Sequence, residues 1–381
     1  MIDYNAALFI DRYLYRNKQP GRKVHLLRAI RSLFFSSIKI PKEKNTDLVF
    51  FRSLNRTDYE RLFNTIANCI SEFSPLVIGN HIKETSKPNI LAIFALARYV
   101  HLLFVFQASS LDERIYLFLR LCFYLEQLSR VKKLKPKYVV LFADMQPADN
   151  LIAQHFRFAG LKTITLQHGL YVDYGDYPTI NVVNYQEQPS EYFLAWGYET
   201  EALINKYHSE NKVVICGKPD IELVKRETDY SGDDYFTVIL DQNPFEKQNI
   251  ELLKIMGKYS KEHNINMNIR FHPGNNQKKY QQWVTYKMEM PIMNSKFVVG
   301  HTSSLIYELL IQGMPTYKYE SCIPYVPLPD ELLFKDQNQL HQKMSLKIDF
   351  ASVGANYISY VSSESRKEYY KFFKKLLHEE I

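Results

Sequence analysis

Cysteine is scarce in this sequence, and its positions suggest no shared role. The 381 residues include four cysteines. Cys69, Cys122, Cys216 and Cys322 are widely scattered and form no Cys-x-x-Cys pair or metal-ligand spacing. We therefore expect reduced, buried thiols in a cytoplasmic protein.

Several features that define other classes of protein are also missing. The start, Met1 to Tyr4, lacks the charged residues and apolar run of a signal peptide. Arg98 and His101 interrupt the most apolar window, 89–107, so we expect a buried helix there rather than a membrane span. The turn at 241–244 lacks the G-x-G-x-x-G fingerprint of dinucleotide sites, and no Asp-x-Asp motif ends an apolar strand. We expect no cofactor and no catalytic metal.

The composition is that of a globular protein with room for two domains. Hydrophobic residues make up 46% of the chain and charged residues 23%. The net charge is +7, and 28 tyrosines and 24 phenylalanines accompany it. A basic, aromatic surface favours anionic membrane lipid, nucleic acid or a phosphorylated substrate. Because the charge is spread along the chain, we expect no nucleic-acid partner.

Strand and helix patterns alternate along most of the chain, which predicts parallel sheets. In the first part, apolar strand patterns occupy 47–51, 75–78, 138–142, 163–166, 192–197 and 213–217. The alternation restarts at 237–240 and continues to 316–319. The predicted class is α/β, with two Rossmann-like domains facing a cleft. The predicted units are an acceptor domain at 1–221, a linker at 222–235, a nucleotide-sugar domain at 236–358, and a basic amphipathic helix at 359–381 that can cross back to the first domain.

An anion site is predicted where a strand gives way to a helix at 300–304. Phe297 to Val299 suits a buried strand, and helical spacing begins at Ser303. A helix N-terminus offers unpaired N–H groups, so His301, Thr302, Ser303 and Ser304 are candidate donor-binding residues. Glu308, one turn further on, can accept both hydroxyls of a ribose. An ordinary N-cap followed by a surface glutamate is the alternative.

A second motif upstream, Arg270-Phe-His272-Pro273, favours the functional interpretation. The proline keeps this segment out of a helix, at the carboxyl end of a strand, where open α/β sheets bind ligands. Arg270 and His272 are therefore further candidates for the donor site. Gln242 and Asn243 lie in the first strand-to-helix turn of the same domain and can donate to a phosphate.

His168-Gly169 follows the strand at 163–166, in the position of a catalytic base. A histidine pKa near 6.5 suits proton removal from a hydroxyl. A structural histidine at a strand end is the alternative. Asp144 and Asp173 are possible orienting or acceptor-binding residues, or solvated loop carboxylates. Lys218 can reach a donor phosphate, although an exposed lysine near a linker is usually only solvated.

The His-Pro element followed some thirty residues later by Ser-Ser resembles the paired motifs of bacterial capsule sialyltransferases and polysialyltransferases. The layout is also similar to the CDP-glycerol glycerophosphotransferases of teichoic acid synthesis, which share the glycosyltransferase-B fold. The resemblance covers the chain from about Lys137 onward. It implies that His272, Ser303 and Ser304 hold the donor phosphate, with Glu308 on the ribose and His168 as base. The acidic pair before glycine of the sialyltransferases is not evident, since Asp233-Asp234 precedes tyrosine.

These observations predict a glycosyltransferase that moves a sugar from a nucleotide-sugar donor to a bacterial capsule or cell-surface glycan, including a lipid-linked oligosaccharide. We expect inversion at the anomeric carbon and no metal. The alternatives are a CDP-alditol phosphotransferase of teichoic-acid type, a hydrolysing nucleotide-sugar epimerase, and a non-catalytic membrane-associated assembly protein.

Two basic amphipathic segments bear on the location of the protein. In 22–35, the apolar positions Val24, Leu27, Ile30 and Phe34 fall on one helical stripe. The other segment is 364–377. Such helices can lie on an anionic bilayer, at the inner face of the cell membrane. For 22–35, packing on its own domain with a solvated basic face is the favoured alternative.

Overall fold

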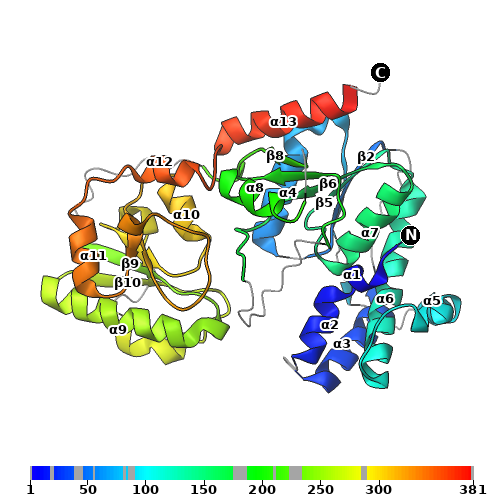
Figure 1. Ribbon diagram of the computed structural model, residues 1–381, viewed down its shortest axis with the longest axis horizontal. Helices are drawn as coiled ribbons and strands as arrows, with labels where there is room; N and C mark the ends of the chain where they lie inside the picture. Colours follow the sequence, from blue (N-terminus) through cyan, green and yellow to red (C-terminus); the bar gives the residue numbers. More distant parts are fainter. Residues whose placement is uncertain are drawn as a thin grey trace.

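The computed structural model describes residues 2–17, 21–37, 46–54, 56–79, 83–84, 91–174, 187–208, 212–222, 234–284 and 290–378. They form two α/β domains, each built on a parallel sheet, and Figure 1 shows the two sheets side by side. The α/β class predicted from the alternating pattern is confirmed. Most of the predicted linker, 222–235, lies outside the described residues. Its last residue, Tyr235, is already the first residue of β9.

The first sheet has six parallel strands among the described residues, in the order β3-β2-β5-β6-β7-β8. Every predicted strand of this domain is present within one or two residues. The strands are β2 (Leu48–Arg52), β3 (Leu76–Gly79), β5 (Tyr138–Leu141), β6 (Lys162–Leu166), β7 (Tyr192–Ala195) and β8 (Val213–Ile215). The connecting helices include α4 (Thr57–Cys69), α6 (Leu111–Val131), α7 (Pro147–Phe158) and α8 (Tyr198–Asn205).

The second sheet repeats the same strand order with five parallel strands in the described ranges, β10-β9-β11-β12-β13. They are β9 (Tyr235–Ile239), β10 (Asn266–Arg270), β11 (Val298–Gly300), β12 (Thr316–Tyr319) and β13 (Leu333–Phe334). The helices are α9 (Glu246–His263), α10 (Leu305–Leu310), α11 (Gln337–Met344) and α12 (Phe350–Ala355). The two-residue strand β13 was not predicted.

The strand order fixes where each sheet can bind a ligand. In the first sheet the chain reverses direction between β2 and β5, and in the second between β9 and β11. Ligands of open α/β sheets bind outside the carboxyl ends of the strands at such switch points. The loops that follow β2 and β9 therefore occupy the expected binding positions of the two domains.

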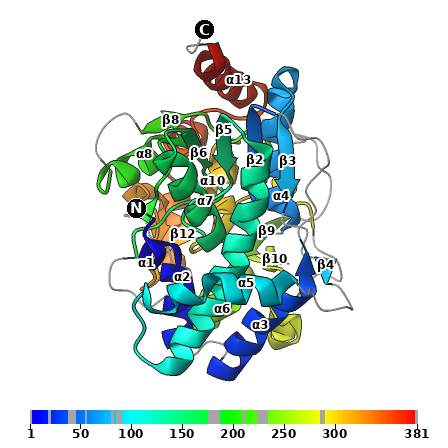
Figure 2. The same cartoon turned by 90° about the vertical axis from the view of Figure 1, so that its right-hand side faces the viewer.

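A helical layer covers the side of the first sheet that faces away from the second domain. It contains α1 (Tyr4–Ala7), α2 (Phe9–Arg16), α3 (Arg22–Phe35), α5 (Leu91–Tyr99) and the 3-10 helix η2 (Val100–Phe104). The elements α2, α3, α5 and η2 pack on α6, whereas α1 packs on α7. Both views place α3, α5 and α6 at one end of the molecule (Figures 1 and 2). A short antiparallel ribbon, β1 (Ser36–Ser37) with β4 (Lys83–Glu84), follows α3.

The predicted apolar stripe of α3 was wrong in part. Its buried residues are His25, Ala29 and Leu33, whereas Val24 and Leu27 are exposed. The reason is that α6 covers the face centred on the small residue Ala29, where two helices can approach closely. The prediction of one buried helix at 89–107 was also wrong, because α5 ends at Tyr99 and η2 continues it. Ile93, Phe94, Val100 and Phe104 are exposed on these elements. No helix in the described part of the chain is long and apolar enough to cross a membrane.

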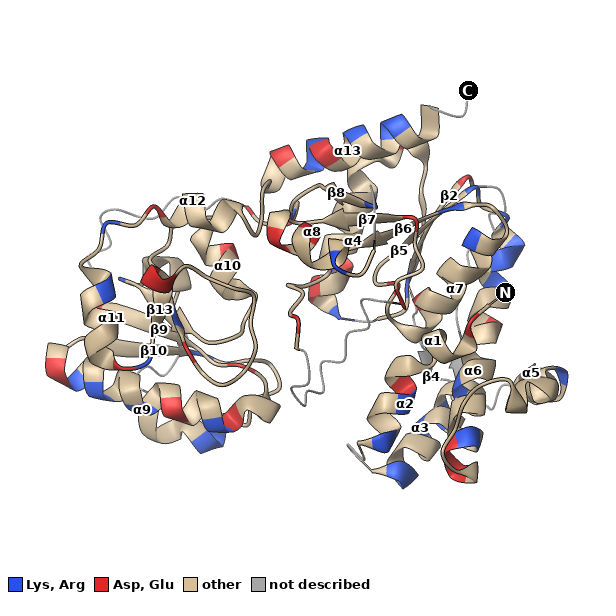
Figure 3. Ribbon diagram, in the orientation of Figure 1, with Lys and Arg blue, Asp and Glu red and all other residues tan. Residues whose placement is uncertain are grey.

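The C-terminal helix α13 (Ser362–His378) lies on the first domain (Figure 1). Its buried residues are Ser365, Tyr369, Phe373 and Leu376. The Ser365 hydroxyl donates to the Cys216 carbonyl at 2.7 Å. Most of its charged residues are exposed, and Figure 3 shows charged positions along the length of the helix. The apolar face of α13 is thus occupied by packing.

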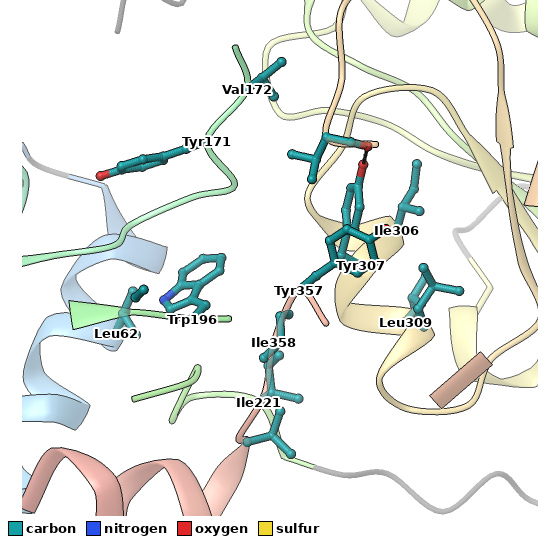
Figure 4. Close-up of a cluster of buried hydrophobic side chains, with 14 of the residues drawn as sticks. Leu62, Tyr171, Val172, Trp196, Ile221, Ile306, Tyr307, Leu309, Tyr357 and Ile358 are labelled. Atoms are coloured by element: carbon teal, nitrogen blue, oxygen red, sulfur yellow. Dashed lines mark hydrogen bonds between the residues drawn. The ribbon is translucent and has the colours of Figure 1, made fainter. Parts of the chain in front are cut away.

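A short segment before α13 joins the two domains. Tyr357 and Ile358 are buried between Trp196 of the first domain and Tyr307 of α10 (Figure 4). The Tyr307 hydroxyl donates to the Val326 carbonyl at 2.7 Å. One hydrophobic cluster therefore continues from the first sheet through this segment into the second domain.

Candidate functional site

One carboxylate, Asp241, connects the loops that follow β9, β10 and β11. Its Oδ2 accepts the Thr302 N–H at 2.8 Å and lies 3.2 Å from His301 Nε2. The backbone carbonyl of Asp241 accepts a hydrogen bond from Asn275 Nδ2 at 2.9 Å. Asn275 Oδ1 in turn accepts the His272 N–H at 2.8 Å. The His-Pro loop and the 300–304 turn are therefore held by the same residue at the switch point.

His301 faces into this network. It is fully buried, and its Nε2 lies 2.9 Å from Asn249 Oδ1. Asn249 Oδ1 accepts the Asp241 N–H, and its Nδ2 donates to the Asp241 carbonyl. His301 Nε2 must therefore carry a proton and donate. Burial lowers the pKa of His301, which favours the neutral ring. The donor-binding roles of His301 and Thr302 stay predictions.

The predicted phosphate donors after β9 and β10 also lie together. Asn243 Nδ2 donates to the Gly274 carbonyl at 2.5 Å, and Asn275 Nδ2 lies 3.3 Å from Asn243 Oδ1. Gln242 is half-buried beside it, and Arg270 is exposed at the last position of β10. Asn243 therefore contacts the His-Pro loop directly, and Gln242 and Arg270 lie at the neighbouring strand ends.

Ser303 and Ser304 precede α10, and both are half-buried. Ser303 Oγ accepts the Leu305 N–H at 3.3 Å. The helix starts two residues later than predicted, at Leu305, and is six residues long. Neither serine is fully buried, so both remain candidates for contact with a ligand.

The predicted ribose acceptor and the predicted phosphate cation pair with each other. Lys218 Nζ lies 3.4 Å from Glu308 Oε2 and 2.9 Å from Asp220 Oδ1. Arg61 of α4 reaches Asp220 from the other side at 3.1 Å. Burial raises the pKa of Glu308, and the nearby Lys218 opposes this rise. A ribose bound to Glu308 would share that carboxylate with Lys218.

His272 has a defined protonation state. The Gly274 N–H donates to His272 Nδ1 at 3.1 Å, so the neutral ring carries its proton on Nε2. Burial lowers the pKa of His272, while Asp241 acts in the opposite direction. His272 is therefore a neutral hydrogen-bond donor, which suits contact with a phosphate oxygen.

His168 lies at the carboxyl end of β6 in an aromatic setting. The rings of Tyr59 and Phe142 lie 5.5 and 5.4 Å from its centroid. Burial lowers the pKa of His168 to about 4, so the ring is neutral at pH 7. Its Nδ1 lies 3.2 Å from the Tyr171 hydroxyl. If Nδ1–H donates to that oxygen, Nε2 is left free to accept a proton.

Arg56 and Asp58, which the sequence reasoning missed, influence both histidines across the two domains. Arg56 lowers the pKa of His168 and of His272, and Asp58 raises both. The two side chains form an ion pair at 2.7 Å, and Arg56 Nη1 donates to the Tyr59 hydroxyl at 2.9 Å. Both residues follow β2, at the switch point of the first sheet, and this position could have identified them as candidate site residues.

The two predicted acceptor carboxylates are in different environments. Asp144 is fully buried, and its Oδ2 accepts the Ser190 N–H at 2.8 Å. Asp173 is partly exposed, 3.9 Å from Lys206 Nζ and 3.5 Å from the Tyr207 hydroxyl. Asp173 is accessible to a ligand in this structure, and Asp144 supports the backbone before β7. Their roles toward an acceptor stay predictions.

Lys318 is a further buried charge that the sequence reasoning missed. It lies on β12, its Nζ is 3.2 Å from the centroid of the Tyr325 ring, and burial lowers its pKa to about 7. In the described ranges, no group of three or more His, Cys, Asp or Glu is arranged to hold a metal ion. Independence from metal stays a prediction.

Comparison with solved structures identifies the fold. The UDP co-structure of MnaA from S. aureus matches with a TM-score of 0.57 and 12% identity, over 87% of this chain and 97% of that chain. A putative UDP-N-acetylglucosamine 2-epimerase from Listeria monocytogenes matches with a TM-score of 0.57 and 9% identity, over 88% and 97%. At such identities the likeness shows the fold alone, which is the glycosyltransferase-B architecture of two facing Rossmann-like domains. No protein-family model and no curated protein sequence matches this chain.

Proposed function

We propose that this protein is a glycosyltransferase that moves a sugar from a nucleotide-activated donor to a hydroxyl of a bacterial surface glycan. The observation that carries the proposal is the pair of neutral histidines, one from each domain, with Arg56 and Asp58 as shared charged neighbours. A base on one domain and a hydrogen-bond donor on the other suit displacement of a nucleotide by an acceptor hydroxyl.

In the proposed reaction, His168 Nε2 takes the proton of the acceptor hydroxyl as its oxygen forms a bond to the anomeric carbon. The bond from that carbon to the donor phosphate breaks, and its electron pair stays on the phosphate. His272 Nε2–H, Ser303 and Ser304 hydrogen-bond the departing phosphate, and Glu308 holds the ribose. A single displacement of this kind inverts the anomeric carbon. The acceptor is a capsule-type or lipid-linked glycan.

A nucleotide-sugar epimerase is the second candidate, favoured by the fold match to a putative enzyme of that kind. An epimerase would change its nucleotide sugar without an acceptor, whereas a transferase would need one. A CDP-alditol phosphotransferase would instead add a phosphate-containing unit, which the product mass reveals.

The test is to incubate the purified protein with nucleotide sugars, with and without glycolipid extract, and to analyse products by mass spectrometry. We expect donor consumption that depends on acceptor. His168→Gln should lower the rate at least a hundredfold, the typical contribution of a general base, and leave nucleotide affinity unchanged. The matched control is His155→Gln, a histidine on α7 away from the candidate site. Turnover without acceptor, or full activity in His168→Gln, would overturn the proposal.

A further inference from the structure

Half of the exposed large apolar side chains in the described part of the chain lie within one short region. Of fourteen such residues, the seven between positions 91 and 115 are Ile93, Phe94, Val100, Phe104, Val105, Leu111 and Ile115. Six of them belong to α5, η2 and the first turns of α6, which contact one another, and Val105 directly follows η2. This set is called the α5–α6 patch below. Such a concentration marks an interaction surface, because singly scattered apolar residues are the norm.

The side chains of this patch project from the protein. Phe94, Phe104 and Leu111 are 66%, 76% and 69% exposed. The Arg114 guanidinium lies 5.2 Å from the centroid of the Phe104 ring. Protruding apolar side chains beside an arginine suit the boundary between the headgroups and acyl chains of a bilayer, where apolar groups insert and cations meet phosphates.

The neighbouring helix α3 supplies the charge. Arg22, Lys23, Arg28 and Arg31 are exposed on it, and α3 contains no acidic residue. Leu27, 65% exposed, lies on the same helix. Figures 1 and 2 place α3 and α5 at the same end of the molecule, and Figure 3 shows the basic residues of α3 there. A basic helix beside an apolar patch is complementary to an anionic lipid surface.

We propose that the α5–α6 patch and the basic face of α3 together form a docking surface for an anionic lipid bilayer. The apolar side chains insert at the interface, and the cations of α3 bind lipid phosphates. The inference does not require the proposed activity, since binding to lipid needs neither donor nor acceptor.

The test is sedimentation of the full chain with vesicles of phosphatidylglycerol and phosphatidylcholine, compared with phosphatidylcholine alone. We expect binding that requires the anionic lipid and weakens with salt. Phe94→Ser with Phe104→Ser should weaken binding about tenfold or more, since two apolar side chains no longer insert. Lys23→Glu with Arg28→Glu should abolish the preference for anionic lipid.

The matched control is Phe158→Ser, because Phe158 is 73% exposed but lies on α7, outside the patch. It should bind vesicles as the wild-type protein does. Failure of the wild-type chain to sediment, or equal binding by the double phenylalanine variant, would overturn the proposal. Self-association that depends on Phe94 and Phe104, without vesicle binding, would assign the patch to a second copy and also overturn it. Chromatography of each variant would show that it remains folded.

Discussion

His168 and His272 owe their neutral state to burial in a protein with a positive net charge. The pKa of His168 falls to about 4 because aromatic rings surround a group that would otherwise be hydrated. Arg56 reinforces this effect on both histidines. A neutral base and a neutral donor are the states that the proposed reaction needs at pH 7.

The lowered pKa of His168 predicts a pH-dependent contribution to stability. Between pH 6.5 and 4 the unfolded chain binds a proton at this histidine and the folded chain does not. Folding is therefore opposed increasingly as pH falls through this window. From pH 7 to pH 5 the wild-type protein should lose about 2 kcal/mol more of its free energy of unfolding than His168→Gln does. Urea denaturation at the two pH values measures the difference, and equal losses would contradict the assigned pKa.

Asp241 is expected to stabilise the loops around the donor site. Its buried carboxylate accepts from Thr302 and lies in contact with His301. Because hydrogen bonds to a charged group contribute more than neutral ones, Asp241→Asn should lower the free energy of unfolding by about 2 kcal/mol. The control is Asp234→Asn, an exposed carboxylate at the other end of the strand, paired with Lys296. Surface ion pairs contribute about 0–1 kcal/mol. Urea denaturation of both variants is the measurement, and equal effects would argue against the role of Asp241.

For single residues, the sequence predicted positions at strand ends but not the hydrogen-bond and ion-pair partners of each side chain. The positions of His168, His272 and Asn243 after strands were predicted, and their roles stay predictions. The pairing of Lys218 with Glu308 was not predictable, because it joins residues ninety positions apart through the arrangement of two domains. Arg56 was missed because a polar turn after an early strand has no distinctive motif.

Among the elements, the segment before α13 packs tightly against the first domain. It passes so close to the first domain that a Cβ on Gly217 would lie 2.0 Å from the Tyr360 carbonyl oxygen. Gly217 also has a φ of +77°, in the left-handed region. Lys218 N–H donates to the same carbonyl at 2.8 Å. Glycine is required here by both space and backbone conformation.

Gly217→Ala is therefore expected to be far more damaging than the same change at a glycine with space around it. Gly160 has a similar φ of +80°, but a Cβ there would meet nothing within 4 Å. Gly160→Ala should cost about 1–2 kcal/mol from backbone strain alone. Gly217→Ala should cost at least about 3 kcal/mol, since the segment must also move away. Thermal denaturation of both variants tests this, and similar melting temperatures would contradict the close approach.

Element positions were largely predictable, because apolar runs and helical spacing are local properties. The helices α1, α2, α11 and α12 and the short strands β1, β4 and β13 were not predicted. Such short elements depend on neighbours that are distant in sequence. The buried face of α3 was mistaken for the same reason, since only its contact with α6 decides which side is covered.

For the whole molecule, the two sheets have the same strand order, and Arg56, which follows β2 at the switch point of the first sheet, influences His272 of the second domain. Alternation in the sequence predicted two parallel α/β domains, and the comparison with solved structures confirms that class. The strand order itself was not predictable, because several orders satisfy the same alternation. The identity of the donor depends on pocket contacts that neither pattern nor fold specifies.

The proposed function requires the second domain to bind a nucleotide through the 300–304 turn. Isothermal titration calorimetry with CMP, CDP, UDP and GDP measures this binding. The wild-type protein is compared with the double variant Ser303→Ala, Ser304→Ala. The control is the double variant Ser36→Ala, Ser37→Ala, which changes two consecutive serines of β1 in the first domain. We predict that one of the nucleotides binds the wild-type protein and that the control binds it equally well. The variant at 303 and 304 should bind it at least about tenfold more weakly, which is a loss of about 1.4 kcal/mol of binding free energy. If none of the four nucleotides binds, or if the variant at 303 and 304 binds as tightly as the wild-type protein, the turn is not the nucleotide site.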